Sequence, residues 1–388
     1  MTRENKYRLS TVFLADFVLF AVLFGVFMYF HYYKSQMNSG NKIDHLGQIT
    51  KPSVSTDSNL PDTPGQTDSG QFGAAFPERF LNGEKKQLVD DKEIRDYLSS
   101  MSFEAYDGDG SGKFIGLYQS GAVFMTVLRV DYTLISGVSG NPHKERYFVY
   151  DFYIRDIENL YSNVTNERKD FEELINEAES TVDFPTDDVS VSGLPIAAVN
   201  GDYWGNTNHT LIAERNGSVL HLSDRVESDV CVLYWDGIMQ TYTPEEFVWS
   251  DVEKRGPYQI WNFGPGLIDA NGEAVKNYSS SSYDPYVINS RHPRTVMGYF
   301  EPGHYCFVTI DGRSDYSDGM TMVEVADLMK KIGCRQAYNM DGGDSTYGYY
   351  GGTVLRCNED RAENGNSRKI YDIICVGEVV RSGNSNKE

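Results

Sequence analysis

The sequence contains few cysteines, and their arrangement gives little support for a metal site. There are five, with no CxxC pair and no Cys/His cluster at ligand spacing. Cys231, Cys306 and Cys375 stand in apolar runs, which predicts buried positions in strands. A Cys334–Cys357 disulfide is compatible with the sequence, but the odd count excludes complete pairing.

An excess of positive charge is also absent. Lys and Arg number 35 against 56 Asp and Glu, so the net charge is −21 and the pI is about 4.7. Such a charge repels nucleic acid and anionic lipid, and we expect no nucleic-acid partner. An anionic substrate would instead need a local group of Arg or Lys. Hydrophobic residues make up 40% of the chain, which is typical of a globular protein with a core.

Long apolar runs are missing except for one at the N-terminus, Thr11–Phe30, whose single charge is Asp16. About 20 residues at ~1.5 Å each span a bilayer core of ~30 Å. Three basic residues precede the run, which places that end in the cytoplasm. We therefore expect a cytoplasmic segment at 1–10, a single-pass uncleaved signal anchor at 11–33, and an extracytoplasmic remainder. Residues 34–75, rich in Ser, Thr, Gly and Pro, predict a flexible linker.

The rest of the chain predicts a β-rich, mixed α/β or α+β fold. We expect a lead-in segment at 76–120, helical and charged from Phe76 to Tyr106, a folded domain at 121–380 and a disordered tail at 381–388. Val123–Ile135 and Tyr147–Ile157 are rich in β-branched and aromatic residues, as strands are. Asp170–Ser180 predicts a helix, and short strands alternate with turns from Leu194 onward, without an internal repeat.

One segment predicts a strand–helix–strand unit. The apolar strand His304–Ile310 ends at Asp311-Gly312-Arg313, and the strand Gln336–Met340 ends at Asp341-Gly342-Gly343. Between them Thr321 and Glu324 form a capping box for a helix to Ile332, which Gly333 ends. Because a crossover makes the two strands parallel, Asp311 and Asp341 should emerge at the same edge of one sheet.

Two carboxylates at one edge have several uses. They can divide acid, base or nucleophile roles across a glycosidic bond, or they can hold a divalent cation. Asp-Gly pairs also occur simply as turns. Two such pairs at matched strand ends, with Arg313 and Ser345 beside them, favour function.

Two further clusters contain polar and aromatic residues at strand ends. Asn200-Gly201-Asp202-Tyr203 follows an apolar strand and offers the amide, acid and ring faces that sugar sites use, although Asn-Gly also makes hairpin turns. In Arg291-His292-Pro293-Arg294-Thr295 two arginines concentrate positive charge, and guanidinium forks match phosphate.

A third motif, Asp107-Gly-Asp109-Gly-Ser111, resembles the front half of a calcium loop. The twelfth position, where such a loop needs a bidentate Glu, is Tyr118. A plain Gly/Asp turn explains the same residues, so Asp107, Asp109 and Ser111 are candidate metal ligands only.

Taken in order, these motifs resemble the phosphodiester glycosidase family, whose best-known member removes N-acetylglucosamine from phosphodiester-capped mannose. The resemblance spans roughly Tyr147–Val379. One departure is Asp344, where the family usually has a third glycine after the second acid. The matching segments are AVNGDYWG (198–205), IWNFGPGLIDANG (260–272), RHPRTVMG (291–298), TIDGR (309–313), GMTMVEVADLMKKIGC (319–334) and AYNMDGGDST (337–346).

The resemblance implies hydrolysis of the bond between an anomeric carbon and a phosphate, and bacterial members suggest an envelope or exopolysaccharide glycan as the substrate. Asp341 or Asp311 would be base or nucleophile, while Arg294 and Arg313 would stabilise the departing phosphate. Ser345 is expected to bind substrate, because no Ser/His/Asp arrangement is evident. No cofactor is established, and a divalent cation, Ca²⁺ or Mg²⁺, stays open. The expected substrate-binding residues are Asn200, Gly201, Asp202, Tyr203, Arg291, Thr295, Gly342, Gly343 and Ser345.

Two other functions fit the same residues. One is a metal-dependent phosphodiesterase that cleaves the P–O bond. The other is a non-catalytic glycan-binding or scaffold protein of polysaccharide assembly, which the Asp344 departure leaves open.

Overall fold

The structure is a computed structural model that describes residues 71–72, 87–88, 111–135, 142–184, 189–203, 212–223, 225–278, 283–356 and 368–383. Within these ranges no helix has the length and apolar character needed to cross a membrane. The predicted signal anchor and Cys357 lie outside the described residues, as does most of the predicted linker.

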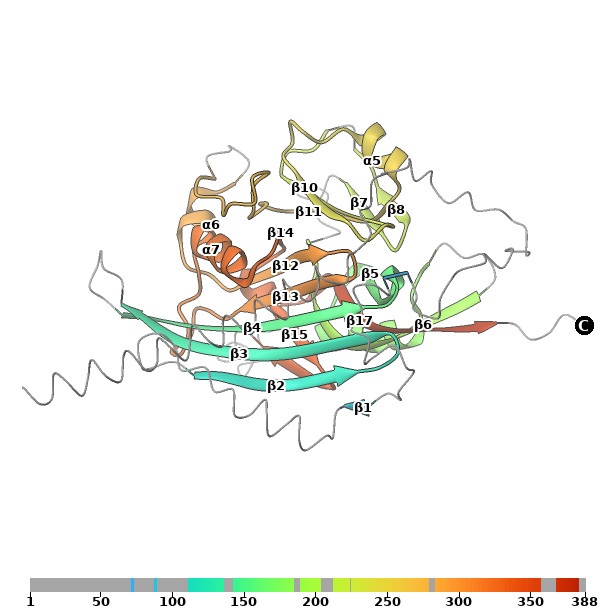
Figure 1. Cartoon of the computed structure of the whole chain (residues 1–388), viewed down its shortest axis with the longest axis horizontal. Helices are drawn as coiled ribbons and strands as arrows, with labels where there is room; N and C mark the ends of the chain where they lie inside the picture. The colour runs from blue at the N-terminus through green and yellow to red at the C-terminus, as the bar shows by residue number, and fades with distance from the viewer. Residues whose placement is uncertain are drawn as a thin grey trace, which may run out of the picture. The chain divides into compact units, whose positions relative to one another are not determined.

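The largest sheet has seven strands, and every neighbouring pair in it is antiparallel. Figure 1 shows β2, β3, β4, β13 and β12 side by side in that order. Strand β2 lies in the lead-in segment beyond its expected helical part, and it pairs along its length with β3. Within the part expected to be helical, Gln87 and Leu88 instead form the short strand β1, which pairs with β2. The strands in sheet order are β1 (Gln87–Leu88), β2 (Ser111–Gln119), β3 (Val123–Ile135), β4 (Pro142–Ile154), β13 (His304–Ile310), β12 (Arg294–Glu301) and β14 (Gln336–Asn339).

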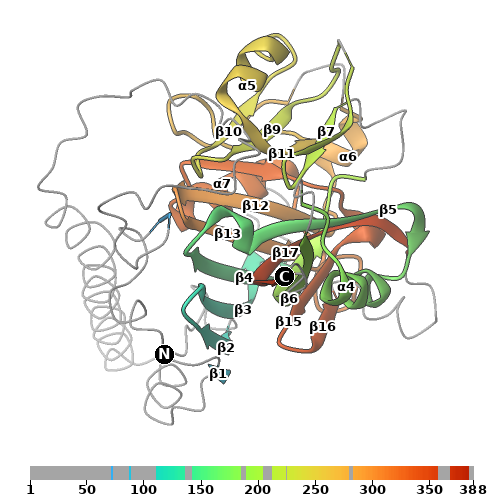
Figure 2. The same ribbon diagram turned by 90° about the vertical axis from the view of Figure 1, so that its right-hand side faces the viewer.

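The described residues also form two five-stranded sheets, whose strands can be followed in Figure 2. Strand β17 reaches into the segment predicted as a disordered tail, because it pairs along its length with β6. The strands of one sheet, in order, are β16 (Thr353–Arg356), β15 (Tyr347–Tyr350), β6 (Val189–Asn200), β17 (Ile370–Gly383) and β5 (Leu160–Lys169). The strands of the other, in order, are β10 (Met239–Tyr242), β9 (Val230–Tyr234), β11 (Pro257–Asn262), β7 (Ala213–Arg215) and β8 (Ser218–His221).

The described helices are short. They are α4 (Phe171–Ser180), α5 (Trp249–Arg255), α6 (Pro285–Asn289) and α7 (Met322–Ile332), with 3-10 turns at Ile157–Asn159 and Gly343–Ser345. A β-rich, mixed fold is therefore confirmed.

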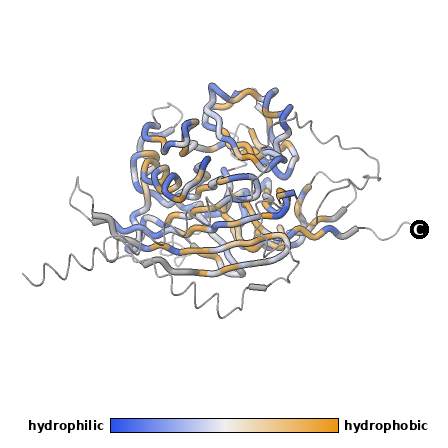
Figure 3. Tube along the Cα trace, viewed as in Figure 1, coloured by the Kyte–Doolittle hydropathy of each residue, from blue (hydrophilic) through white to orange (hydrophobic). Residues whose placement is uncertain are grey.

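Both faces of β12 and β13 are buried, whereas β3 and β4 bury alternate residues. On β12 and β13 neighbouring residues alternate between two clusters: Val296 and Val308 pack under α7, while Met297 and Phe307 face the main core. Figure 3 shows apolar residues concentrated along these central strands. Full burial on both faces fixes the strand register, since a one-residue slip would exchange the two sets of side chains.

The predicted strand–helix–strand unit is present. Thr321 and Glu324 form the capping box of α7, and Gly333 ends the helix in the left-handed conformation. Strands β13 and β14 run in the same direction, but they are not neighbours: β12 lies between them and is antiparallel to both. The carboxyl ends of β13 and β14 and the start of β12 therefore meet at one edge.

The cysteines predicted to be buried in strands are so placed, in β9, β13 and β17. The Sγ atom of Cys334 lies 3.8 Å from that of Cys306. Gly298 makes room for both sulfur atoms, because a Cβ there would lie 2.7 Å from each.

Candidate active site at one edge of the large sheet

The loops that follow β13 and β14 meet at the backbone of Pro293, just before β12. Gly343 donates its N–H to the Pro293 carbonyl at 2.9 Å. A Cβ on Gly342 would lie 2.8 Å from that carbonyl oxygen, and a Cβ on Gly312 would lie 2.9 Å from the Pro293 nitrogen. Glycine at both positions therefore lets the loops carrying Asp311 and Asp341 pack against the same residue.

The end of β6 joins this edge through Asn200, which is almost fully buried. Its Nδ2 donates to the Asp341 carbonyl at 2.7 Å. Its Oδ1 accepts from the Thr295 hydroxyl at 2.7 Å and from the Tyr347 N–H at 3.1 Å. Gly201 accepts from the Asp341 N–H at 3.1 Å. The amide and its neighbour thus hold the backbone of Asp341 in place, and all the hydrogen bonds of Asn200 go to protein groups.

The Asp341 carboxyl is buried and accepts the N–H of Gly342 at 2.9 Å through Oδ1. Among the described residues no group meets hydrogen-bond geometry at its Oδ2. Burial raises the pKa of Asp341, and the nearby Ser345 hydroxyl and Arg368 lower it in part. A buried carboxylate with one open oxygen and a raised pKa is suited to accept a proton.

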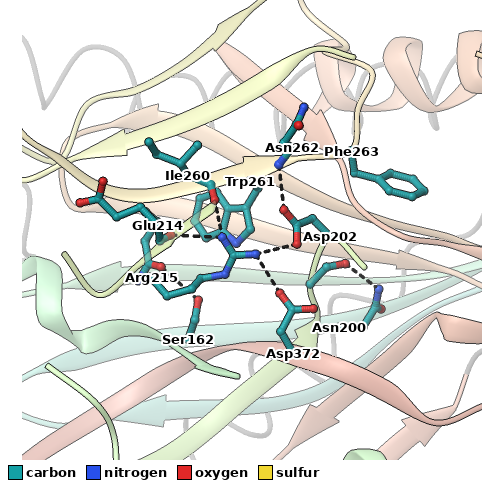
Figure 4. Close-up of polar contacts among 12 residues, drawn as sticks. Ser162, Asn200, Asp202, Glu214, Arg215, Ile260, Trp261, Asn262, Phe263 and Asp372 are labelled. Carbon is teal, nitrogen blue, oxygen red and sulfur yellow. Dashed lines mark hydrogen bonds and ion pairs between the residues drawn. The ribbon is translucent and has the colours of Figure 1, made fainter. Parts of the chain in front are cut away.

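Asp202 and Asp372 share the buried guanidinium of Arg215 (Figure 4). The Nη2 atom of Arg215 lies 2.6 Å from Asp202 Oδ1 and 3.0 Å from Asp372 Oδ2. The second oxygen of Asp202 accepts the N–H of Asn262 at 2.7 Å. Burial, and then the like charge of Asp202, raise the pKa of Asp372 to about 7. Asp202 is 0% exposed, so the structure places it beneath the edge in an ion triad that ties β6, β7, β11 and β17 together.

The two arginines predicted to face phosphate have different surroundings. Arg294 is buried and donates to the carbonyls of Met320 at 3.1 Å, Val287 at 2.6 Å and Ser290 at 3.1 Å. Burial, with a contribution from Arg313, lowers the pKa of Arg294 to about 10. Arg313 is partly exposed, has a left-handed backbone with φ of 59°, and donates to Asp344 at 3.1 Å. Of the two arginines, Arg313 is the exposed one.

His292 is a site residue that the sequence prediction left out of its list. Its Nδ1 lies 2.9 Å from Arg313 Nη2. A guanidinium can only donate, so Nδ1 accepts and the ring proton is on Nε2. Burial first, then Arg294 and Arg313, lower the pKa of His292 to about 4. The Nε2–H is buried, and no group among the described residues meets hydrogen-bond geometry there, although a backbone interaction with Tyr286 raises the pKa in part. His292 is thus a neutral donor beside Arg313. The sequence signal was its place between two arginines.

Asp311 is fully buried at the same edge. Its Oδ2 lies 3.9 Å from Arg146 Nε, its N–H donates to the Arg146 carbonyl at 2.8 Å, and its own carbonyl accepts from Ser317 at 2.8 Å. These contacts connect Asp311 to β4 and to the loop after β13.

An aromatic group lies at the end of β6. Tyr203 has a left-handed backbone with φ of 70°, and its hydroxyl accepts from Arg168 Nη2 at 2.7 Å. The guanidiniums of Arg168 and Arg368 lie 5.4 and 5.1 Å from the centre of its ring. Tyr371 packs edge-on against Tyr203 at 6.3 Å.

The side chains of His143, Glu145 and Glu324 lie close enough together to be considered as metal ligands. Arg291 donates to Glu324 and lies 3.4 Å from His143 Nε2, so a guanidinium already supplies the positive charge in this group. The residues therefore do not fit a divalent cation. Of the calcium-loop candidates, Asp107 and Asp109 lie outside the described residues, and Ser111 is the first residue of β2. The twelfth position, Tyr118, is buried in β2 and donates to Glu378.

Fold and site together define a β-rich domain that gathers a buried carboxyl, a neutral histidine and arginines at the end of a sheet. Residues 195–377 match the family model described as phosphodiester glycosidase, which confirms the predicted resemblance. The matched segment contains Asn200, His292, Asp311 and Asp341 but not Arg168.

Two known proteins are similar over parts of their length. The SPbeta prophage-derived uncharacterized protein YomE of Bacillus subtilis (strain 168) is 23% identical over 185 residues, which is 47% of this chain. The chain spans only 28% of that relative's length. The solved catalytic domain of zebrafish N-acetylglucosamine-1-phosphodiester alpha-N-acetylglucosaminidase, auto-inhibited by its pro-peptide, aligns with a TM-score of 0.51. The alignment covers 77% of this chain and 96% of that one at 15% identity, so it shows a shared fold.

Proposed function

We propose that this protein is a membrane-anchored, extracytoplasmic phosphodiester glycosidase that hydrolyses the bond between a sugar's anomeric carbon and a phosphate. The observation that carries the proposal is the meeting of four sequence-distant segments, ending in Asn200, Pro293, Gly312 and Gly342, around the buried Asp341 carboxyl. The match of residues 195–377 to the family supports the same chemistry.

In the proposed reaction water attacks the anomeric carbon, and the C1–O bond breaks with its electron pair going to the phosphate oxygen. The products are a free reducing sugar and a phosphate monoester. Asp341 takes the proton of the attacking water, which its raised pKa favours. A phosphate monoester is a good leaving group, so stabilisation of its developing charge matters more than protonation.

Arg313 and His292 are placed to stabilise that charge. Among the described residues no group meets hydrogen-bond geometry at the buried Nε2 of His292, and the Arg313 guanidinium lies 2.9 Å from Nδ1 of the same ring. Both groups donate hydrogen bonds at pH 7, because the pKa of His292 is lowered to about 4 and arginine stays protonated. Arg294, whose donors go to three carbonyls, shapes the loop before β12 instead.

The cellular setting of the proposal comes from the sequence. An N-terminal apolar run that follows basic residues would anchor the domain outside the membrane, and a phosphate-bearing envelope or exopolysaccharide glycan would be its substrate.

The test is release of reducing sugar from a panel of sugar 1-phosphodiesters by the full-length chain and by its Asp341→Asn variant. We expect the variant to lose at least 100-fold in kcat, the scale of a general base. Because burial raises the pKa of Asp341, removing its charge should not lower the Tm, so lost activity would not reflect unfolding. The control is Asp251→Asn, an exposed acid on α5. Full activity of the Asp341 variant would remove this residue from the mechanism.

A second candidate function is glycan binding without catalysis. The observation that favours it is Asp344, whose carboxylate lies 3.1 Å from Arg313 and reduces the positive charge available to a leaving phosphate. Binding of glycan phosphodiesters with no product from any of them would support this alternative. Asp344→Gly, which restores the family's usual residue, should then create or raise hydrolytic activity.

A further inference from the structure

Arg168 and Arg368, which have no role in the mechanism above, lie beside the aromatic rings of Tyr203 and Tyr371. Arg168 is on β5 and Arg368 lies just before β17, so neighbouring strands bring them to the same end of their sheet. Tyr371, on β17, belongs to the same group, since the Arg168 guanidinium lies 5.2 Å from its ring centre. Arg168 is exposed and Arg368 is half-buried.

Neither guanidinium has a carboxylate within 4.0 Å among the described residues. Arg313, at the same edge, is by contrast paired with Asp344 at 3.1 Å, in a chain whose net charge is −21. Instead both Arg168 and Arg368 lie over the ring of Tyr203, and Arg168 also lies over that of Tyr371. Cation–π stacking orients a guanidinium and leaves most of its N–H donors available.

The backbone of Tyr203 is held in a strained conformation to build this group. A φ of 70° is costly for a bulky residue and persists only when its surroundings enforce it. The preceding residue, Asp202, is fixed by Arg215 and by Asn262, and this anchors the turn. Strain of this kind concentrates at binding sites.

The group lies next to Asp341. Tyr347 donates its hydroxyl to the Arg368 carbonyl at 2.9 Å and its N–H to Asn200 at 3.1 Å, and Asn200 in turn holds Asp341. The charge of Arg368 also reaches the Asp341 carboxyl, whose pKa it lowers. The donors of Arg294 go to carbonyls, and Arg313 shares its charge with Asp344. Arg168 and Arg368 therefore add two cations beyond Arg313 that can contact an anion near Asp341.

We propose that Arg168 and Arg368, oriented by Tyr203 and Tyr371, bind the anionic oxygens of the substrate's phosphate and make the site selective for phosphodiesters over neutral glycosides. The identity of the ligand as a sugar phosphodiester rests on the proposed function. The recognition of a phosphate group rests on the cations and their stacking alone.

The test combines kinetics with binding of a probe that needs no turnover. Arg168→Gln and Arg368→Gln are compared with the control variant Arg225→Gln. Arg225 is on a loop, and its side chain is 83% exposed. Sugar release is measured on the phosphodiester panel, and inorganic phosphate binding is measured by calorimetry. We expect KM and the phosphate Kd to rise about tenfold or more in each of the first two variants, the effect of losing a charge-assisted hydrogen bond, with kcat changed less than threefold. Arg368→Lys should recover part of the loss, since it keeps the charge but not the fork.

The outcomes separate the two proposals. Unchanged KM and Kd in both glutamine variants, or no phosphate binding by the wild-type chain, would overturn the inference while leaving the glycosidase activity standing. Arginine-dependent phosphate binding without any sugar release would uphold the inference and refute the proposed function. An equal loss in Arg225→Gln would show that only net charge matters, and would also overturn the inference.

Discussion

Arg215 carries a charge that the fold beneath the site depends on, and replacing it with methionine tests this directly. The substitution keeps a long apolar stem but removes the cation shared by Asp202 and Asp372 at 2.6 and 3.0 Å. All three side chains are at most 2% exposed, so water cannot replace the lost partner. Removing one member of a buried ion pair costs roughly 3–5 kcal/mol, because the remaining charge is left uncompensated.

For a domain of this size each kcal/mol lowers the Tm by about 2–4 °C, so the variant should melt roughly 6–20 °C below the wild type. The assay is scanning calorimetry or urea unfolding at pH 7.5. Arg225→Met is the matched control, since its ion pair with Glu227 spans 3.9 Å on the surface and should be worth under ~1 kcal/mol. An equal and small loss in both variants would refute the argument that the triad holds these strands together.

The pH dependence of the same triad gives a second readout. Asp372 has a folded pKa of about 7, above its unfolded value, so the folded state binds the extra proton and stability falls as pH rises between about 4 and 7. Asp372→Asn should flatten this part of the stability curve. The cost of Arg215→Met should shrink as pH falls through the same window, because protonation neutralises the unpaired acids. A cost that stays constant from pH 5 to pH 8 would contradict the burial of two charged carboxylates.

Two further predictions concern the edge itself. In an NMR titration His292 should have a midpoint near pH 4 rather than near 6.5, with the Nε2–H tautomer above that pH. Because its folded pKa is below the unfolded value, the free energy of unfolding should fall as pH falls from about 6.5 toward 4. A midpoint near 6.5 would contradict its neutral contact with Arg313. Gly201→Ala should destabilise the domain by about 1–3 kcal/mol in urea unfolding, because its Cβ would lie 2.0 Å from Asp372 Oδ2, and a neutral effect would show that this packing relaxes easily.

The local patterns in the sequence predicted much of the fold correctly. Strand β3 and strand β13 have the predicted bounds, and the Thr321–Glu324 capping box and Gly333 delimit α7 as expected. The insertion of β12 between β13 and β14 was not predictable, because strand order depends on contacts between segments far apart in the chain. It explains why His292 joins Asp311 and Asp341 at one edge.

The site was predictable as a set of motifs, but the division of labour within it was not. Asn200 and Asp202 look alike as polar residues after a strand, yet their side chains bond the protein itself, to Asp341 and to Arg215. Arg294 and Arg313 likewise differ in the partners that the fold gives them. Arg294 donates to three carbonyls, whereas Arg313 is exposed and pairs with Asp344. Arg168 carries no motif, and only the pairing of β5 with β17 brings it beside Tyr371.

The position of the bond that breaks is the most direct test of the account as a whole. The full-length chain would be given a sugar 1-phosphodiester in water enriched in oxygen-18, and the products would be weighed by mass spectrometry. Attack at the anomeric carbon puts the heavy oxygen in the sugar and none in the phosphate monoester. Heavy oxygen in the phosphate would mean that the P–O bond is cleaved, and would contradict the role given to Asp341.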